Sequence, residues 1–275
     1  MELKNFTIYY SLILVVTLCS ISCEEEKEKV NYLENFENKK EEKRIKDSVL
    51  IASLPKPDTN LINNNNVVDK LTWYGKENKE TKVKIKTVYG EMIIKLYEDT
   101  PLHRANFIML TKRKYFDSTL FYRVVNDFMI QGGNSDRDEV SQKMKEIGFY
   151  TIPDEILKSH YHTRGVIAMA VSEQLDTPEE ERNKHSSPYN FYIVQNGPLG
   201  ENYLKNVIKK YKLELTNKEK QLYKQKGGAP HLDGQYTVFG EVIKGFDVID
   251  KIAQQQTDKN ERPLNDITMS VEIIE

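Results

Sequence analysis

The 275-residue sequence is poor in cysteine, in net charge and in long apolar stretches. Its two cysteines, Cys19 and Cys23, both lie near the N-terminus, so the rest of the chain can form neither a disulfide framework nor a cysteine-built metal site. Forty basic and forty-two acidic residues leave a net charge of −2, which excludes the strongly basic surface of a general nucleic-acid-binding protein. A mean hydropathy of −0.62 excludes a multi-span membrane protein.

Residues 1–22 are typical of a signal peptide. Lys4 lies in a short polar start, and residues 6–17 are almost wholly apolar, which suits a signal-peptide core better than a permanent span. Small residues lead into Cys23 and three glutamates follow it, a pattern that resembles a bacterial lipoprotein signal. We therefore expect a lipoprotein anchored in the cell envelope through lipid on Cys23, which would mean the periplasm or outer membrane if the source is Gram-negative. An ordinary cleaved signal or an uncleaved anchor is the alternative.

Residues 23–80 differ in composition from the rest of the chain. They are rich in glutamate, lysine and asparagine, so we expect a mostly irregular tether rather than a core. Short apolar groups at 49–51 and 71–74 could dock on the domain that follows. From residue 81 the apolar residues alternate, and a single domain is expected over 81–275.

The pattern of this domain predicts many short strands and few helices. Alternation at 83–88 and a second apolar segment at 92–97 predict a hairpin. After it, Thr100 as the capping residue and Pro101 at the first helical position mark a helix start. Further strands are expected at 120–125, 129–131, 166–170, 191–194, 238–242 and 267–274, and further helices at 203–215, 218–226 and 246–252. This order favours a mainly β protein with a closed or nearly closed antiparallel sheet and helical plugs.

The segment most informative about chemistry reads FYRVVNDFMIQGG. If alternation holds along its strand, Arg123 shares a face with Phe121, which is unexpected for a face packed in a core. Phe128 and Gln131 follow a turn, and the glycine pair 132–133 indicates close backbone approach or positive φ. An arginine, an amide and large apolar side chains around one turn suit a pocket for an apolar ring beside an amide group.

The pattern F-x-R-V-V-x-x-F-M-x-Q-G-G closely resembles the signature of the cyclophilin-type peptidyl-prolyl isomerases. Three further blocks follow in the family's order: GVIAMA from Gly165, FYIV from Phe191 and LDGQYTVFGEV from Leu232. The resemblance covers about residues 83–274 apart from one insertion. It implies a closed eight-stranded antiparallel β-barrel capped by two helices, with a peptide groove on its outer face and no cofactor.

The resemblance also implies roles for residues of this sequence. Arg123 matches the catalytic arginine. The residues that match the peptide groove are Phe128, Met129, Gln131, Ala170, Val171, Asn190, Tyr192, His231, Leu232 and Tyr236. Tyr192 stands where phenylalanine is usual, and its added hydroxyl should be tolerated if the ring tip reaches water.

Together these matches imply isomerisation of X–Pro bonds in proline-containing peptides and unfolded exported proteins. An always-charged arginine can donate to the twisted amide while apolar side chains hold the proline ring. A proline-binding or chaperone-like module without catalysis, and an envelope scaffold, are the alternatives. We expect a monomer that binds no nucleic acid.

Two segments lengthen the chain relative to the family, at 173–185 and at about 199–229. In the second, apolar residues recur at helical spacing among lysines, which favours a helical hairpin packed on the barrel. Because this insertion leads directly into His231 and Leu232, a lid or client-binding arm is the other interpretation. His160, His162 and His185 are the candidate metal ligands, but no cysteine or further suitably spaced histidine joins them, so no metal site is expected.

Overall fold

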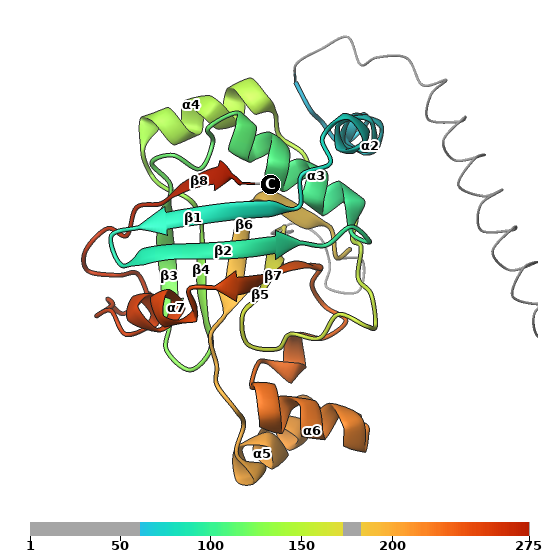
Figure 1. The fold of residues 1–275 in the computed structure, drawn as a ribbon, viewed down its shortest axis with the longest axis vertical. Helices are drawn as coiled ribbons and strands as arrows, with labels where there is room; N and C mark the ends of the chain where they lie inside the picture. Colours follow the sequence, from blue (N-terminus) through green and yellow to red (C-terminus); the bar gives the residue numbers. More distant parts are fainter. Residues whose placement is uncertain (1–60, 173–182, 275) are drawn as a thin grey trace, which may run out of the picture. The chain divides into compact units, whose positions relative to one another are not determined.

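Eight antiparallel strands form the framework of the computed structural model, which describes residues 61–172 and 183–274 (Figure 1). The strands are β1 (Lys82–Thr87), β2 (Gly90–Leu96), β3 (Leu120–Val125), β4 (Met129–Asn134), β5 (Val166–Val171), β6 (Ser186–Val194), β7 (Val238–Lys244) and β8 (Ser270–Ile273). They form one sheet in the order β3-β4-β6-β5-β7-β2-β1-β8. In Figure 1, β1 and β2 run horizontally and β3 and β4 nearly vertically, because the sheet is strongly curled. The predicted mainly β fold with eight antiparallel strands is confirmed.

The curled sheet is an open half-barrel, so the closed barrel implied by the resemblance is wrong. Its edge strands are β3 and β8. Within the described residues they meet through an isolated bridge from Leu120 to Thr268 and neighbouring backbone hydrogen bonds, without a continuous ladder. The last strand was expected over 267–274, but only Ser270–Ile273 is extended, since the chain enters it irregularly. All four residues of β8 pair with β1, and the contacts at this seam come from residues 267–269, before the strand begins.

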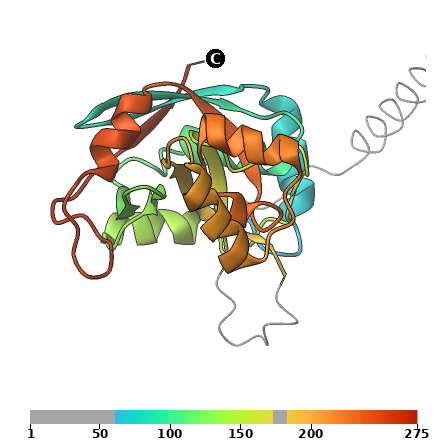
Figure 2. The same ribbon diagram turned by 90° about the horizontal axis from the view of Figure 1, so that it is seen from below.

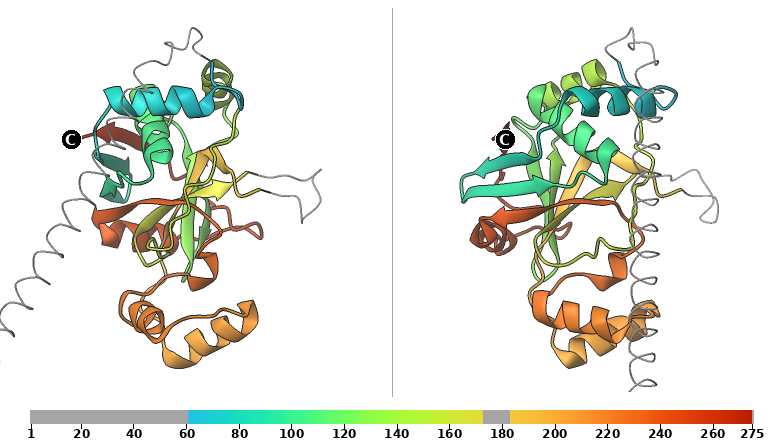
Figure 3. Two further views of the ribbon diagram at one scale, coloured as in Figure 1. Left: turned by 90° about the vertical axis from the view of Figure 1, so that its right-hand side faces the viewer. Right: turned by 45° about the vertical axis from the view of Figure 1, so that its right-hand side comes forward.

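Seven helical elements accompany the sheet in the described residues. They are α2 (Val67–Glu77), α3 (Pro101–Lys112), α4 (Asp138–Ile147), α5 (Glu201–Tyr211), α6 (Asn217–Lys226), the short η2 (Pro230–Leu232) and α7 (Phe246–Ala253). The predicted helices of the insertion are confirmed as α5 and α6, a pair that we call the hairpin. It lies at the opposite end of the molecule from α3 and α4 (Figure 1, Figure 3), and its helices pack against each other (Figure 2). Sequence reasoning missed α4, although its buried Val140 and Ile147 stand two helical turns apart.

Residues 61–80 belong to the folded body, although the tether was predicted to extend through them. Val67 and Leu71 of α2 are buried in the main core. Arg104 of α3 donates to the carbonyl oxygen of Gly75 at 3.3 Å, which ties the two helices together. Residues 61–80 are therefore not part of an irregular tether, because a narrow apolar side is enough to dock an otherwise polar helix.

Several sequence predictions fall outside the described residues. These are the signal peptide at 1–22, the lipidation site at Cys23, the tether up to residue 60 with its apolar group at 49–51, and most of the lengthened loop at 173–185. In the described ranges, no helix combines the length and apolar character needed to cross a membrane.

Side chains of the central strands alternate between two apolar clusters. Ile130 and Phe191 point into the main core, whereas their neighbours Met129 and Tyr192 point to the opposite face of the sheet. We call the cluster on that opposite face the outer-face cluster. It consists of Met129, Val166, Ala168, Tyr192, Val194, Ala229 and Val238. The sheet thus carries a second apolar surface, on which the candidate site is built.

Candidate active site

A hollow of about 230 Å³ opens on the outer-face cluster, and we call it the cup. Its lining residues are Arg123, Phe128, Met129, Gln131, Ala170, Val171, Tyr192, Leu232 and Tyr236. Met129 and Tyr192 are 2% and 5% exposed, whereas Phe128, Leu232 and Tyr236 are half-buried around them. All of these residues were predicted as site residues, and the structure brings them around one apolar hollow that contains one cation and one amide.

Arg123 reaches the cup through an irregularity in β3. Phe121 pairs with Gly132 and Arg123 with Gln131, so the ladder slips by one residue between them. A bulge of this kind turns the side chains that follow it. Phe121 consequently lies in the main core, while Arg123 lines the cup on the other face. The prediction that both share a face is wrong, and the bulge explains how a cation follows a core phenylalanine so closely.

Two side chains hold the guanidinium of Arg123. Its Nε donates to Oε2 of Glu261 at 2.7 Å, and its Nη1 lies 3.4 Å from Oε1 of Gln131. Because Gln131 also lines the cup, the amino end of the guanidinium is turned toward it. Glu261 is itself held against β3, since its carbonyl oxygen accepts from the backbone N–H of Val124 at 2.8 Å. Sequence reasoning missed Glu261, which lies in a loop far from the motif.

The glycine pair after Gln131 is required by close packing. Gly133 has a φ of +98°, and a Cβ there would lie 2.2 Å from the carbonyl oxygen of Tyr189. A Cβ on Gly132 would lie 2.7 Å from the side chain of Met269. The predicted close approach and positive φ are both confirmed. They allow β4, which contributes Met129 and Gln131 to the cup, to pack closely between β3 and β6.

Residues 82–273 match the family model described as cyclophilin type peptidyl-prolyl cis-trans isomerase/CLD. The chain belongs to this family. A protein of Staphylococcus saprophyticus, provisionally named a peptidyl-prolyl cis-trans isomerase, is 33% identical over 200 residues, which cover 71% of this chain and 93% of the relative. A similarly named protein of Staphylococcus epidermidis is 29% identical, over 70% of this chain and 91% of its own length. The predicted resemblance is confirmed, and the chain is a cyclophilin-type enzyme.

A solved structure is also similar to this cyclophilin. The crystal structure of a cyclophilin type peptidyl-prolyl cis-trans isomerase from Cryptosporidium parvum is 22% identical, with a TM-score of 0.49, over 71% of this chain and 98% of that one. The family assignment rests on the sequence matches.

Beneath the cup of this cyclophilin, a chain of hydrogen bonds leads to the hairpin. The Tyr192 hydroxyl lies 2.9 Å from Nε2 of His162, whose Nδ1 lies 3.0 Å from Oδ1 of Asp233. Oδ2 of Asp233 accepts from the hydroxyl of Tyr223, in α6, at 2.5 Å. We call these four side chains the buried relay. Because a carboxylate only accepts, Nδ1 of His162 carries the proton toward Asp233.

The buried relay corrects the expectation for Tyr192. Its ring tip does not reach water, and its hydroxyl is satisfied by His162 instead. Burial raises the pKa of Tyr192 well above its usual value, and the neighbouring Tyr236 and Asp233 act in the same direction. The hydroxyl therefore stays protonated, and the extra polar group compared with phenylalanine is a structural link to the hairpin.

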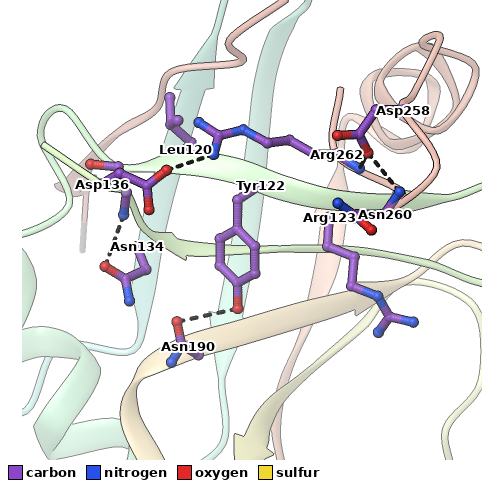
Figure 4. Close-up of a pocket in the computed structure, with 10 residues that line it drawn as sticks. Leu120, Tyr122, Arg123, Asn134, Asp136, Asn190, Asp258, Asn260 and Arg262 are labelled. Atoms are coloured by element: carbon purple, nitrogen blue, oxygen red, sulfur yellow. Dashed lines mark hydrogen bonds and ion pairs between the residues drawn. The ribbon is translucent and has the colours of Figure 1, made fainter. Parts of the chain in front are cut away.

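Two predicted groove residues lie outside the cup, each in an adjoining hollow. Asn190 lines a polar hollow of about 630 Å³ on the other side of Arg123, where it accepts from the hydroxyl of Tyr122 at 3.3 Å (Figure 4). His231 lines a hollow of about 170 Å³ beside Phe128, which we call the hairpin hollow. Burial lowers the pKa of His231, and the nearby charge of Lys210 lowers it further. Arg123 and Phe128 are thus the boundaries between the cup and its neighbours.

A serine, a histidine and a glutamate meet elsewhere in the geometry of a hydrolase triad. Nε2 of His103 lies 2.9 Å from Oγ of Ser186, and Nδ1 lies 2.7 Å from Oε2 of Glu155. Both His103 and Ser186 are fully buried, so a substrate cannot reach them. Glu155 also accepts from the backbone N–H groups of Leu102 and His103, a capping role that Thr100 was expected to fill. The trio anchors the start of α3 to β6.

The histidines considered as metal ligands have separate partners. Nε2 of His160 pairs with Asp99 at 3.1 Å, whereas His162 belongs to the buried relay. Across the described ranges, no cluster of three or more histidine, cysteine or acidic side chains is placed to hold a metal ion.

Proposed function

We propose that this cyclophilin isomerises X–Pro bonds in exported or envelope proteins, and that Arg123 lowers the rotational barrier while the cup holds the proline ring. The observation that carries the proposal is the position of a single guanidinium in the wall of an otherwise largely apolar hollow. An apolar ring fits the buried floor of the cup. The cup measures about 230 Å³, so an amide attached to that ring would lie close to the guanidinium in its wall.

The chemistry requires little more than this arrangement. Rotation about an X–Pro bond meets a barrier of about 18–20 kcal/mol because the C–N bond has partial double-bond character. No covalent bond breaks, so neither a nucleophile nor a proton carrier is needed. At the twisted geometry the nitrogen regains its lone pair, and a donor that binds this state more strongly than the planar state accelerates exchange.

Arg123 meets the requirements for that donor. A hydrogen bond from a charged group contributes about 1.5–3 kcal/mol, and each 1.4 kcal/mol is a factor of about ten in rate. Glu261 holds Nε of Arg123 and Gln131 lies beside Nη1, so the guanidinium is oriented before substrate arrives. Preorganised donors lose little entropy at the moment of reaction.

Isomer exchange in a short proline peptide, measured by NMR with the purified full chain in detergent, tests this activity. The proposal predicts exchange cross-peaks between the cis and trans forms of the peptide, and a cis–trans exchange rate that increases with enzyme concentration. Peptide peaks that shift without faster exchange would mean that the domain binds proline segments and does not catalyse.

Attachment to the cell envelope is the second part of the proposal and rests on the sequence around Cys23. Lipid on that cysteine would hold the enzyme where exported chains fold, since acyl chains supply membrane affinity through their buried methylenes. Cells expressing the wild type or Cys23→Ser can be labelled with a fatty acid and then fractionated. We expect label and membrane recovery in the wild type and loss of both in the variant. An unlabelled wild type would contradict lipidation while leaving the isomerase activity to its own test.

A further inference from the structure

The hairpin hollow lies directly beside the cup, and most of one wall comes from the insertion. Tyr203, Val207 and Tyr211 of α5 stand four residues apart, so they share one side of the helix, and all three line the hollow. The facing wall includes His231 of η2 and Phe128. Figure 1 shows the hairpin next to the turn that carries η2. Since Phe128 also lines the cup, the two hollows adjoin at one ring.

Three rings lead from the cup to the hairpin. Phe128 stacks on His231 with ring centroids 5.5 Å apart and an interplanar angle of 28°. His231 in turn stacks on Tyr211 at 4.4 Å and 14°. We call these three side chains the aromatic ladder. Burial keeps His231 neutral near pH 7 by lowering its pKa, so the ladder presents an uncharged aromatic surface.

Part of this surface is exposed although it is aromatic. Tyr203 and Tyr211 are 50% and 44% exposed on a helix whose other exposed residues are polar. The adjoining side of α5 already has partners, because Leu204 packs with Leu199 and Tyr223 in a small core at the base of the hairpin. Aromatic side chains gathered at the edge of a binding hollow are a feature of ligand surfaces.

The hairpin is held in place, so the hollow is formed before a ligand arrives. Tyr223 of α6 reaches Asp233, and through His162 the buried relay connects it to Tyr192 in the floor of the cup. The N–H of Leu199 donates to the carbonyl oxygen of Tyr223 at 3.1 Å, which closes the base of the hairpin. A preformed wall reduces the ordering entropy that a ligand must overcome.

We propose that the hairpin hollow is a subsite of the peptide groove, and that it binds a large apolar side chain, above all an aromatic ring, of the same peptide. This inference rests on the proposed function, because it requires a proline in the cup. A cavity of about 150 Å³ is large enough for benzene, and the hollow measures about 170 Å³. Phe128, at the edge of the cup, is linked to Tyr211 by two ring stacks of 5.5 Å and 4.4 Å. An extended peptide advances roughly 3.3 Å per residue, so the ring in the hollow belongs about two or three residues from the proline.

The chemistry of the subsite selects unfolded chains. In folded proteins aromatic side chains are mostly buried, whereas an unfolded chain exposes them beside its prolines. A ring of the peptide binds against Tyr211 and Val207 when the neighbouring proline is held in the cup at the same time. The insertion therefore adds a second anchor to a site that otherwise grips one ring.

A peptide scan on the full chain tests the proposal. A reference peptide carries alanine around one proline, and four partners carry phenylalanine two or three residues before or after it. The wild type should show a kcat/KM about three to ten times higher for one of the partners than for the reference. Tyr211→Ala should bring that ratio close to 1, and Tyr211→Phe should retain it. Lys209→Ala, on the opposite side of α5, is the matched control and should keep the wild-type ratio.

Each failure has a distinct meaning. A ratio near 1 at all four positions, with the reference peptide still isomerised, overturns the subsite and leaves the proposed function standing. No acceleration of any peptide overturns the proposed function itself. Nuclear Overhauser contacts between the peptide ring and the Val207 methyl groups provide a readout that needs no variant. Contacts are expected for the preferred peptide, and their absence would also overturn the subsite.

Discussion

The cup and the hairpin hollow adjoin at Phe128 but are built in different ways. The cup lies on the sheet, and its floor residues Met129 and Tyr192 are 2% and 5% exposed. The hairpin hollow uses a helix whose lining tyrosines are about half exposed. Side chains on packed strands hold a fixed geometry, which a rate-enhancing donor requires, whereas the half-exposed tyrosines of the helix offer a surface for a side chain of the ligand. The difference suggests chemistry in the cup and selection in the hairpin.

The sharpest way to break this division is to remove the donor from the cup. Arg123→Ala should lower kcat/KM for a short proline peptide by about tenfold or more, because a charged hydrogen bond to the twisted amide is lost. Arg123→Lys keeps the charge without the planar fork and should give an intermediate value. A coupled isomerase assay measures both, with circular dichroism to check the fold. Wild-type turnover in Arg123→Ala would contradict the assigned role.

Removing the hairpin should separate selection from chemistry. Gly197 and Gly227 lie in close contact, so a short linker can replace the residues between them. We expect the enzyme's acceleration of refolding of a proline-limited protein substrate to fall by about tenfold. Its kcat/KM for a short peptide should fall by only about two- to threefold, because the buried relay loses Tyr223. The two substrates are assayed side by side with the same enzyme preparation. Equal losses on both would contradict a separate role for the hairpin.

The link between the two regions can be cut without removing either. Tyr192→Phe leaves Nε2 of His162 without its hydrogen-bond partner, and should cost about 1–3 kcal/mol in the free energy of unfolding. Tyr223→Phe removes the hydroxyl at the other end of the relay and should destabilise the protein by a similar or smaller amount. Urea unfolding measures both. No loss in either variant would mean that the relay does not stabilise the contact between floor and hairpin.

Glu261 offers a smaller test of how the cup holds its cation. Glu261→Gln removes the charge that faces Nε of Arg123, and both side chains of this pair are about 40% exposed. Exposed ion pairs contribute up to about 1 kcal/mol, so kcat should fall no more than about fivefold. Asp258→Asn in the same loop is the control. An unchanged kcat, with or without a change in KM, would show that Glu261 does not position the guanidinium for the reaction.

The weakest expected effect is the pH dependence of the aromatic ladder. The pKa of His231 is lower in the folded protein than its ordinary value of 6.5, chiefly through burial. Its contribution to stability is therefore complete above about pH 6.5 and is lost as the pH falls through the lowered pKa. Urea unfolding at pH 7.5 and pH 5 should show a smaller pH difference in His231→Gln than in the wild type. The same pH difference in the variant and the wild type would mean that His231 does not contribute to the pH dependence of stability.

How much the sequence could predict depends on the range of the interactions involved. The cup residues stand in short motifs, and the bounds predicted for β3 agree with the structure to the residue. The slip after Phe121 was not predictable, because a bulge depends on the partner strand. Glu261 and the buried relay join residues far apart in the chain, and α2 docks a mostly polar segment through a few apolar contacts. The prediction of a closed sheet was wrong for the same reason. Closure depends on how the chain leading into β8 lies against β3, and the composition of β8 does not determine this.

The central claim is that Arg123 stabilises the twisted amide and not the bound ground state. The most direct test compares the wild type and Arg123→Ala with one proline peptide at saturating enzyme, and measures the dissociation constant and the cis–trans exchange rate of the bound peptide by NMR. The account predicts dissociation constants within about threefold of each other and an exchange rate about tenfold or more slower in the variant. An unchanged exchange rate with a weakened affinity would contradict it.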